Sequence, residues 1–263
     1  MSADHRTKEH FVAVLIDSDN AMPSKLEATL DEVVKFGRVT IRRAYGDWTT
    51  QSMVSWKKLL QEHAIHPVQQ FRNTVGKNAS DSAMIIDIMD ILHREEIDVF
   101  CLVSSDSAFT RLATRLRESG KIVVGIGKKT TPRSFQNGCN RFIYTENLKG
   151  TKPEPRKRAP RKTTTSSSSS TSTATAARKT TTRKSAEPSD PVPLIKRAFD
   201  VASEESFVIL LSELGSALRS IDPSFDSRSY GKEKLVDLIR ALPNEFQIET
   251  KKDQPFTIYI RRS

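Results

Sequence analysis

The chain has 263 residues, of which 37% are hydrophobic and 28% charged, and its formal net charge is +10. No run of apolar residues approaches the ~20 that a membrane-spanning helix needs, and the polar start MSADHRTKEH lacks the apolar core of a signal peptide. The two cysteines, Cys101 and Cys139, form no disulfide or metal-binding pattern. We therefore expect a soluble, cytoplasmic protein with no membrane partner.

The charge is unevenly spread along the chain. Residues 1–148 carry 20 Lys and Arg against 18 Asp and Glu, residues 149–189 carry 11 against 2, and residues 190–263 carry 11 against 12. The middle segment has few large apolar side chains and cannot bury enough surface to fold. We predict a first domain at 1–148, a basic Ser/Thr-rich disordered linker at 149–189 and a second domain at 190–263. The linker charge suits attraction to RNA or DNA, or merely keeps the linker extended and soluble.

The first predicted domain alternates strands with helices. Short apolar runs predict strands at 11–16, 38–46, 66–71, 98–103 and 121–127, with a final edge strand at 142–148. Apolar residues at helical spacing predict helices at 24–37, 50–63, 81–96 and 108–119. The alternation predicts an α/β fold whose mostly parallel sheet carries helices on both faces.

Acidic residues stand where predicted strands end. Asp17, Asp19 and Asn20 follow the first strand, Asp106 follows the strand at 98–103, and Asp81 opens a helix. Ligands of parallel sheets gather at the carboxyl ends of the strands. A carboxylate cluster there would favour Mg²⁺ or Mn²⁺, which activates water and stabilises a phosphoryl group under attack. The alternative is that the aspartates only cap the helices that follow them.

Three further residues are candidates for the same site. Asn20 would hold a metal-bound water or a phosphate oxygen, or form a turn. Lys77, in the stretch GKNASD before the helix at 81–96, would contact a phosphate, or remain a solvated loop lysine. Asp47 follows the strand at 38–46 and would join the edge of the site, or form a turn.

The second predicted domain mixes helices with a terminal hairpin. We expect helices at 192–204, 208–221 and 230–242, and strands at 246–250 and 256–260. Arg228, Lys232 and Lys234 are candidate contacts to a phosphate backbone. The net charge of −1 in this segment argues against a broad electrostatic footprint for nucleic acid.

Motifs in the first domain resemble those of the NYN domain, a branch of the PIN-like nuclease superfamily. The stretches are IDSDN, AYGDW, GKNASD, VSSDSAF and TPRSFQNGCNRFIYTENL, in that order. The resemblance implies a PIN-like α/β/α sandwich that cleaves RNA with the help of a metal. It places Asp17, Asn20, Asp81 and Asp106 at the catalytic and metal site, and Asp47 is a weaker candidate.

The second domain resembles the LOTUS domain, also called OST-HTH. The resemblance rests on Leu214-Gly215, Pro223-Ser224-Phe225, Tyr230-Gly231 and Leu235, which recur in the expected order. It implies a small winged-helix-like fold that binds RNA or docks another protein.

One position departs from the NYN pattern. Many members carry a second aspartate in the stretch S-x-D-x-D-F, where this chain has Ala108. Our first hypothesis is a metal-dependent endoribonuclease of RNA processing or turnover, with Asp17, Asp81 and Asp106 as metal ligands and with Lys77, Arg228 and Lys232 on the substrate. The alternative is a non-catalytic RNA-binding or scaffold protein whose nuclease site is degenerate. A phosphatase with Asp17 as nucleophile is the third hypothesis.

Overall fold

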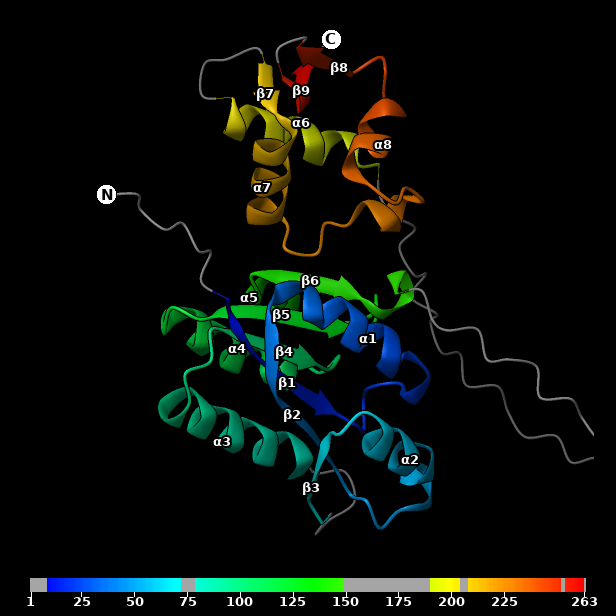
Figure 1. Cartoon of the computed structure of the whole chain (residues 1–263), viewed down its shortest axis with the longest axis vertical. Helices are drawn as coiled ribbons and strands as arrows, with labels where there is room; N and C mark the ends of the chain where they lie inside the picture. Colours follow the sequence, from blue (N-terminus) through cyan, green and yellow to red (C-terminus); the bar gives the residue numbers. More distant parts are fainter. Residues whose placement is uncertain (1–8, 72–78, 149–189, 204–207, 252–253, 263) are drawn as a thin grey trace, which may run out of the picture.

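The computed structural model describes residues 9–71, 79–148, 190–203, 208–251 and 254–262. They form two lobes, a lower one built on a large sheet and an upper one built on helices and a small sheet (Figure 1). The predicted linker at 149–189 and the candidate Lys77 lie outside the described residues.

The lower lobe is built on a parallel sheet of six strands. Their order is β3-β2-β1-β4-β5-β6, and every neighbouring pair is parallel. The strands are β1 (Phe11–Asp17), β2 (Arg38–Gly46), β3 (His66–Gln69), β4 (Val99–Val103), β5 (Ile122–Gly127) and β6 (Arg141–Tyr144). The chain builds outward from β1 to β3 and then returns to β4 beside β1. The predicted α/β fold with a parallel sheet is confirmed.

Helices cover both faces of this sheet. Those of the lobe are α1 (Leu26–Val33), α2 (Val54–Glu62), α3 (Ala79–Arg94), α4 (Thr110–Glu118) and α5 (Arg133–Gly138). Short 3-10 turns flank them at Pro23–Lys25, Val34–Phe36, Gln51–Met53, Ser107–Phe109 and Thr145–Asn147. The α/β/α layering follows from strands that bury side chains on both faces.

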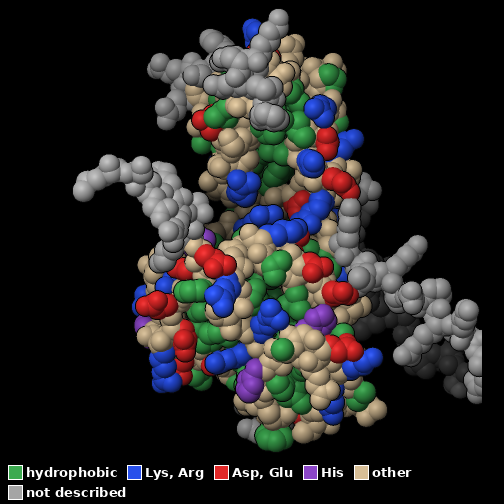
Figure 2. Space-filling model, in the orientation of Figure 1, with side chains coloured by type: hydrophobic (Ala, Val, Ile, Leu, Met, Phe, Trp, Pro, Cys, Tyr) green, Lys and Arg blue, Asp and Glu red, His purple; other side chains and the backbone are tan. Residues whose placement is uncertain are grey.

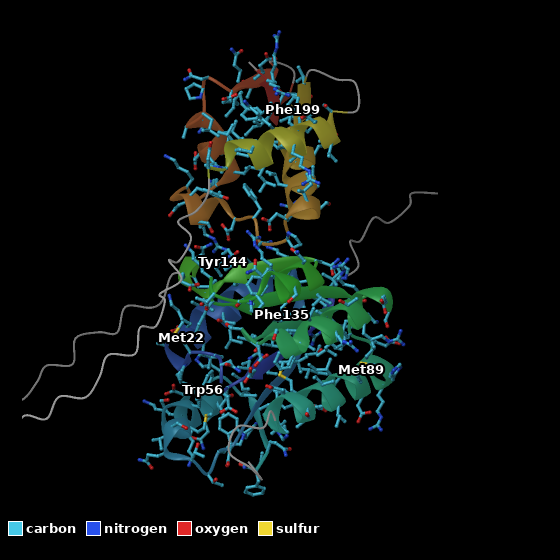
Figure 3. All side chains as sticks on the ribbon, turned by 180° about the vertical axis from the view of Figure 1, so that it is seen from behind. Met22, Trp56, Met89, Phe135, Tyr144 and Phe199 are labelled. Atoms are coloured by element: carbon cyan, nitrogen blue, oxygen red, sulfur yellow. The ribbon has the colours of Figure 1, made fainter. Side chains whose placement is uncertain are left out.

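Two hydrophobic cores lie on opposite faces of the sheet. Strand β1 alternates between them: Val14 packs with α1 and α2, and Leu15 packs with α3, α4 and α5. Figure 3 labels Trp56 in the first core and Phe135 in the second. This double burial explains the unbroken apolar run of the first strand.

The upper lobe has its own core. Its elements are α6 (Val192–Ala202), β7 (Val208–Leu210), α7 (Leu211–Ile221), the 3-10 turn Ser227–Tyr230, α8 (Leu235–Arg240), β8 (Phe246–Lys251) and β9 (Gln254–Arg262). The small sheet is antiparallel in the order β7-β9-β8. Buried Phe199, Leu214, Leu218 and Ile260 pack between the helices and this sheet.

The prediction of a helix over 208–221 was wrong at its start. Val208–Leu210 form β7, paired with β9, and the helix begins only at Leu211. The Glu213 side chain accepts a hydrogen bond from the Leu210 backbone N–H over 2.9 Å, which caps the helix start. Pairing with a strand some 50 residues away cannot be read from local periodicity.

No helix in the ranges that the structure describes combines the length and apolarity needed to cross a membrane.

The two lobes contact each other at β6, the outermost strand of the large sheet (Figure 1). The Phe142 backbone N–H donates to the carbonyl of Pro223 over 2.7 Å. The Asn147 side chain donates to the Ser229 hydroxyl over 2.9 Å. The contact between lobes therefore includes both backbone and side-chain hydrogen bonds.

Candidate active site

Asp17 stands at the carboxyl end of β1 and is 1% exposed. Its Oδ2 accepts hydrogen bonds from the Ser104 hydroxyl over 2.6 Å and from the Asn20 side-chain amide over 2.7 Å. Burial raises the pKa of Asp17 above its usual value, whereas the bonds from Ser104 and Asn20 lower it. The chain thus provides the donors that a buried carboxylate needs.

Asn20 donates two hydrogen bonds to the Asp17 carboxylate. Besides its side-chain amide, its backbone N–H lies 3.3 Å from Oδ1 of Asp17. The Asp19 backbone N–H donates to the same oxygen over 3.2 Å, and the Asp19 side chain is exposed. The sequence left open whether Asn20 forms a turn or a site contact, and its bonds here orient the Asp17 carboxylate.

Asp81 lies in the first turn of α3 and is 7% exposed. Burial, together with the negative charges of Asp17, Asp106 and Asp19, raises its pKa to about 6. The charges of the aspartates at the ends of β1 and β4 therefore affect the pKa of Asp81. The predicted neighbours lie close enough for their charges to interact.

Asp106 follows β4 and begins a 3-10 turn. Its Oδ1 accepts the Ala108 backbone N–H over 2.8 Å, so the carboxylate caps the turn Ser107–Phe109. Its own backbone N–H donates to the Ser104 hydroxyl over 3.1 Å. Asp106 therefore caps the turn that follows it, and its backbone also shares the Ser104 hydroxyl with Asp17.

Ser104 was not among the predicted site residues. It directly follows the buried strand β4, is 1% exposed, and connects the Asp17 carboxylate with the Asp106 backbone. The signal in the sequence is a serine pair directly after VFCLV, which places a hydroxyl at the end of a buried apolar run. Only the pairing of β1 with β4 reveals which carboxylate it serves.

The side chain of Asp47 forms hydrogen bonds with the turn after β2 and with β3. Its Oδ1 accepts the Thr49 hydroxyl over 2.6 Å and the Gln69 side-chain amide over 2.9 Å. It also accepts the Thr49 backbone N–H over 3.2 Å. These bonds close a turn after β2 and connect it to β3.

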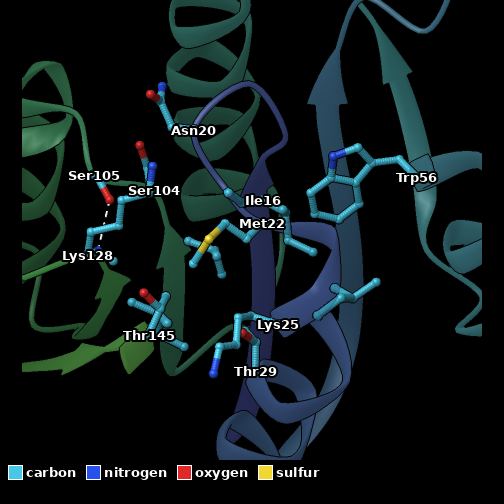
Figure 4. A pocket seen from close by; sticks show the side chains of 15 residues that line it. Ile16, Asn20, Met22, Lys25, Thr29, Trp56, Ser104, Ser105, Lys128 and Thr145 are labelled. Carbon is cyan, nitrogen blue, oxygen red and sulfur yellow. Dashed lines mark hydrogen bonds between the residues drawn. The ribbon is translucent and has the colours of Figure 1, made fainter. Parts of the chain in front are cut away.

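A small pocket lies beside Asn20 and Ser104, and none of the three acids lines it. It encloses about 10 Å³, close to the space of one water molecule. Figure 4 shows Asn20, Ser104 and Ser105 on its walls, with the bond from the Lys128 backbone to the Ser105 hydroxyl, 2.9 Å long, drawn as a dashed line.

The acids of this site have the right chemistry for a metal ion, but their spacing is too wide to hold one. Carboxylates that raise one another's pKa are donors that fit a hard divalent cation. Among the residues with described positions, however, no group of three or more His, Cys, Asp and Glu side chains is close enough to hold a metal ion. The acids are near one another, but their side chains do not converge on one coordination site.

The two predicted substrate residues of the upper lobe differ in their surroundings. The Arg228 guanidinium contacts Asp226 over 2.6 Å and, across the lobes, Glu32 over 3.2 Å. Lys232 is half-buried and lines a groove of about 550 Å³ between the lobes. Phosphate contact by Arg228 would compete with two carboxylates.

Both lobes match known domain families. The sequence model of the NYN domain matches residues 11–146, more than half of the chain. The chain belongs to the NYN domain family. The model of the OST-HTH/LOTUS domain matches residues 183–256. Both predicted resemblances are confirmed, and these domains indicate a nuclease and RNA binding respectively.

Individual relatives of this NYN protein are distant. An uncharacterized protein of Methanocaldococcus jannaschii is 28% identical over 129 residues, which cover 48% of this chain and 50% of the relative. The chain thus spans about half the length of the curated relative that it matches. The name of that relative states no activity.

Two solved structures align with part of this chain. A protein of unknown function from Vibrio parahaemolyticus has a TM-score of 0.44 at 19% identity, with 55% of this chain and 96% of that chain covered. An uncharacterized protein from Nitrosomonas europaea has a TM-score of 0.26 at 24% identity, with 44% and 90% covered. Neither likeness bears on the activity of this NYN protein.

Proposed function

We propose that this NYN protein is a metal-dependent endoribonuclease of RNA processing or turnover. The observation that supports the proposal is the acidic cluster of buried Asp17 and Asp81 with half-buried Asp106, in which burial and the neighbouring charges raise the pKa of Asp81. Neighbouring carboxylates are costly at such a place unless a cation or proton offsets their charge. The NYN domain indicates a nuclease, and the OST-HTH/LOTUS domain indicates an RNA substrate.

NYN and PIN-like nuclease domains generally use divalent metals. We assign Asp17, Asp81 and Asp106 as the residues that would hold Mg²⁺ or Mn²⁺, and their carboxylates would have to draw closer together around the ion. The ion would acidify a water molecule and offset charge on the phosphate. Ser104 and Asn20 would keep Asp17 ionised and fix the direction of its carboxylate. Asn20 would thus be a positioning residue of the site.

We infer cutting within a strand from the place of the acids. Asp17 and Asp106 stand at the carboxyl ends of β1 and β4, so the RNA would lie over this edge of the sheet. A strand that lies across an open surface does not need to enter by its end. Lys77, Arg228 and Lys232 remain our candidates for phosphate contact, and Arg228 would first have to leave Glu32. A protein partner of the upper lobe and a cytoplasmic location also remain predictions.

Ala108 favours a second candidate, a non-catalytic RNA-binding or scaffold protein. Its backbone N–H donates to the Asp106 carboxylate, but its methyl group cannot ligate a metal or orient water. The Ala108→Asp variant separates the two candidates. If this variant creates metal-dependent cleavage that the natural protein lacks, the site is degenerate and the scaffold reading is correct.

The decisive experiment is cleavage of a labelled, mixed-sequence RNA pool by the purified protein with Mg²⁺, Mn²⁺ or EDTA. We expect cutting with a metal, none with EDTA, and loss of cutting in Asp17→Asn. Asp31→Asn is the matched control, because Asp31 is exposed on α1. Circular dichroism verifies that both variants fold. Full activity in Asp17→Asn would refute the assignment, and trapping of a phosphorylated Asp17 would favour the phosphatase hypothesis.

A further inference from the structure

A second groove between the lobes contains unneutralised positive charge. It measures about 700 Å³ and lies between the end of α4, the start of β6 and the last turns of α7. Arg117, Arg141 and Arg219 line it, and none of the described residues that line it is acidic. Figure 2 shows Lys and Arg side chains gathered where the two lobes meet.

Two of these arginines are held by neutral groups. The Arg117 guanidinium donates to the carbonyls of Asn137 and Gly138 over 2.8 and 3.3 Å. The Arg219 guanidinium lies 3.4 Å from the Ser216 hydroxyl. Within the described parts of the chain, neither Arg117 nor Arg219 has a carboxylate partner. These contacts fix the guanidinium groups without cancelling their charge.

Other arginines at the same junction are neutralised. Arg133 pairs with Asp222 over 3.2 Å, and Arg228 pairs with Asp226 and Glu32. The acids of the junction thus serve Arg133 and Arg228, which join the lobes. Arg117 and Arg219 have no such pairing among the described residues.

Arg141 lies between these two sets. Its guanidinium is 5.3 Å from the centre of the Phe36 ring and 3.8 Å from a carboxylate oxygen of Glu32. Burial lowers the pKa of Arg141, and the charges of Arg219 and Arg228 lower it further, against the opposing effect of Glu32. An anion in the groove would relieve the repulsion between Arg141 and Arg219.

We propose that this groove binds the phosphate backbone of RNA through Arg117, Arg141 and Arg219. The planar guanidinium fork matches phosphate oxygens, and the volume suits part of a nucleic acid strand. The choice of RNA rests on the proposed function. Arg141 begins β6, whereas the acids stand where β1 and β4 end, so the sheet height of roughly 15 Å separates groove and acids. The groove would hold the strand at a distance from the cut.

The test is fluorescence anisotropy of a labelled single-stranded RNA of mixed sequence, with the full chain in EDTA. We expect the double variant R117A/R219A to weaken binding about tenfold at low salt. The slope of log K against log salt should fall by about 1.4, because each lost phosphate contact contributes about 0.7. The matched control is K58A/R94A, which removes two exposed cations on α2 and α3.

The outcomes are distinct. Affinity and salt slope equal to those of the control would overturn the proposal. Binding of poly-glutamate that depends on the two arginines, without a matching effect on RNA, would also overturn it and indicate an acidic protein partner. A second pair of variants, R219E and R219K, avoids Arg117 and its backbone contacts; we expect R219E to bind RNA weakly and R219K to retain most of the affinity. Because EDTA prevents cutting, loss of binding in the groove variants supports the site even if the nuclease proposal fails.

Discussion

The Ser104 hydroxyl donates to Oδ2 of Asp17 over 2.6 Å and joins the ends of two neighbouring strands inside the protein. The same hydroxyl accepts the Asp106 backbone N–H, so one side chain connects two of the acids proposed for catalysis. The geometry at the ends of β1 and β4 therefore depends on a residue that carries no charge.

Removal of this hydroxyl should impair both stability and cleavage. In Ser104→Ala, the buried Asp17 carboxylate loses a donor that lowers its pKa, so the pKa should rise and cleavage should require a higher pH. We expect a loss of about 1–2 kcal/mol in the free energy of unfolding. Urea unfolding and a pH profile of cleavage measure these effects. Exposed Ser107→Ala is the control, and equal profiles for the two variants would contradict the role of Ser104.

Asp81 should make the metal-free protein less stable as the pH rises. Because its pKa of about 6 in the folded state exceeds the ordinary 3.8, the folded state binds more protons between these values. Stability from this group is therefore present below pH 4 and is lost as the pH rises through 6. Asp81→Asn should gain about 1 kcal/mol at pH 7 and nothing at pH 3.5, after allowance for solvent screening.

The measurement for Asp81 is urea unfolding in EDTA at a series of pH values. Asp90→Asn is the matched control, since Asp90 lies on the same helix and is more than half exposed. A stability gain in Asp81→Asn that does not vary between pH 3.5 and 7 would show that the effect is not ionisation.

Gly127 permits the close approach of β5 to the site. A Cβ there would lie 2.4 Å from the Ser104 carbonyl oxygen and 2.8 Å from the Thr131 hydroxyl. Gly127→Ala should therefore cost about 1–3 kcal/mol and lower cleavage through displacement of Ser104. At Gly46 the nearest atoms would be 3.5 Å away, so Gly46→Ala should remain close to the wild type. Thermal unfolding compares them, and equal melting temperatures would contradict the packing.

A pair of cysteines introduced across the contact between the lobes should form a disulfide. Asn147 and Ser229 are hydrogen-bonded across them over 2.9 Å, and the native Cys101 and Cys139 are buried. We expect Asn147→Cys with Ser229→Cys to cross-link under mild oxidation, as seen by peptide mass spectrometry. Asn147→Cys with Ser212→Cys is the control, because Ser212 begins α7 at its far end (Figure 1). Equal cross-linking of both pairs would show that the lobes do not hold this arrangement.

Much of the lower lobe was predictable because its strands are buried on both faces. The predicted bounds of β2 agree with the structure, and those of β1 differ by one residue. Helix α5 was missed because six residues give too short a pattern, although Phe135 is buried there. The acids could be placed at strand ends, but the bond from Ser104 to Asp17 and the pairing of Arg228 with Glu32 join residues far apart in sequence. Such pairs arise only from tertiary packing.

The bond from the Phe142 backbone to Pro223 has a consequence for the lower lobe alone. Outermost strands expose backbone groups that pair readily with another chain, and β6 is such a strand. A fragment that ends after β6 would lose the carbonyl that occupies the Phe142 N–H and would offer its sheet to a second copy of itself. We therefore expect the upper lobe to shield the edge of the large sheet from self-association, whether or not RNA is bound.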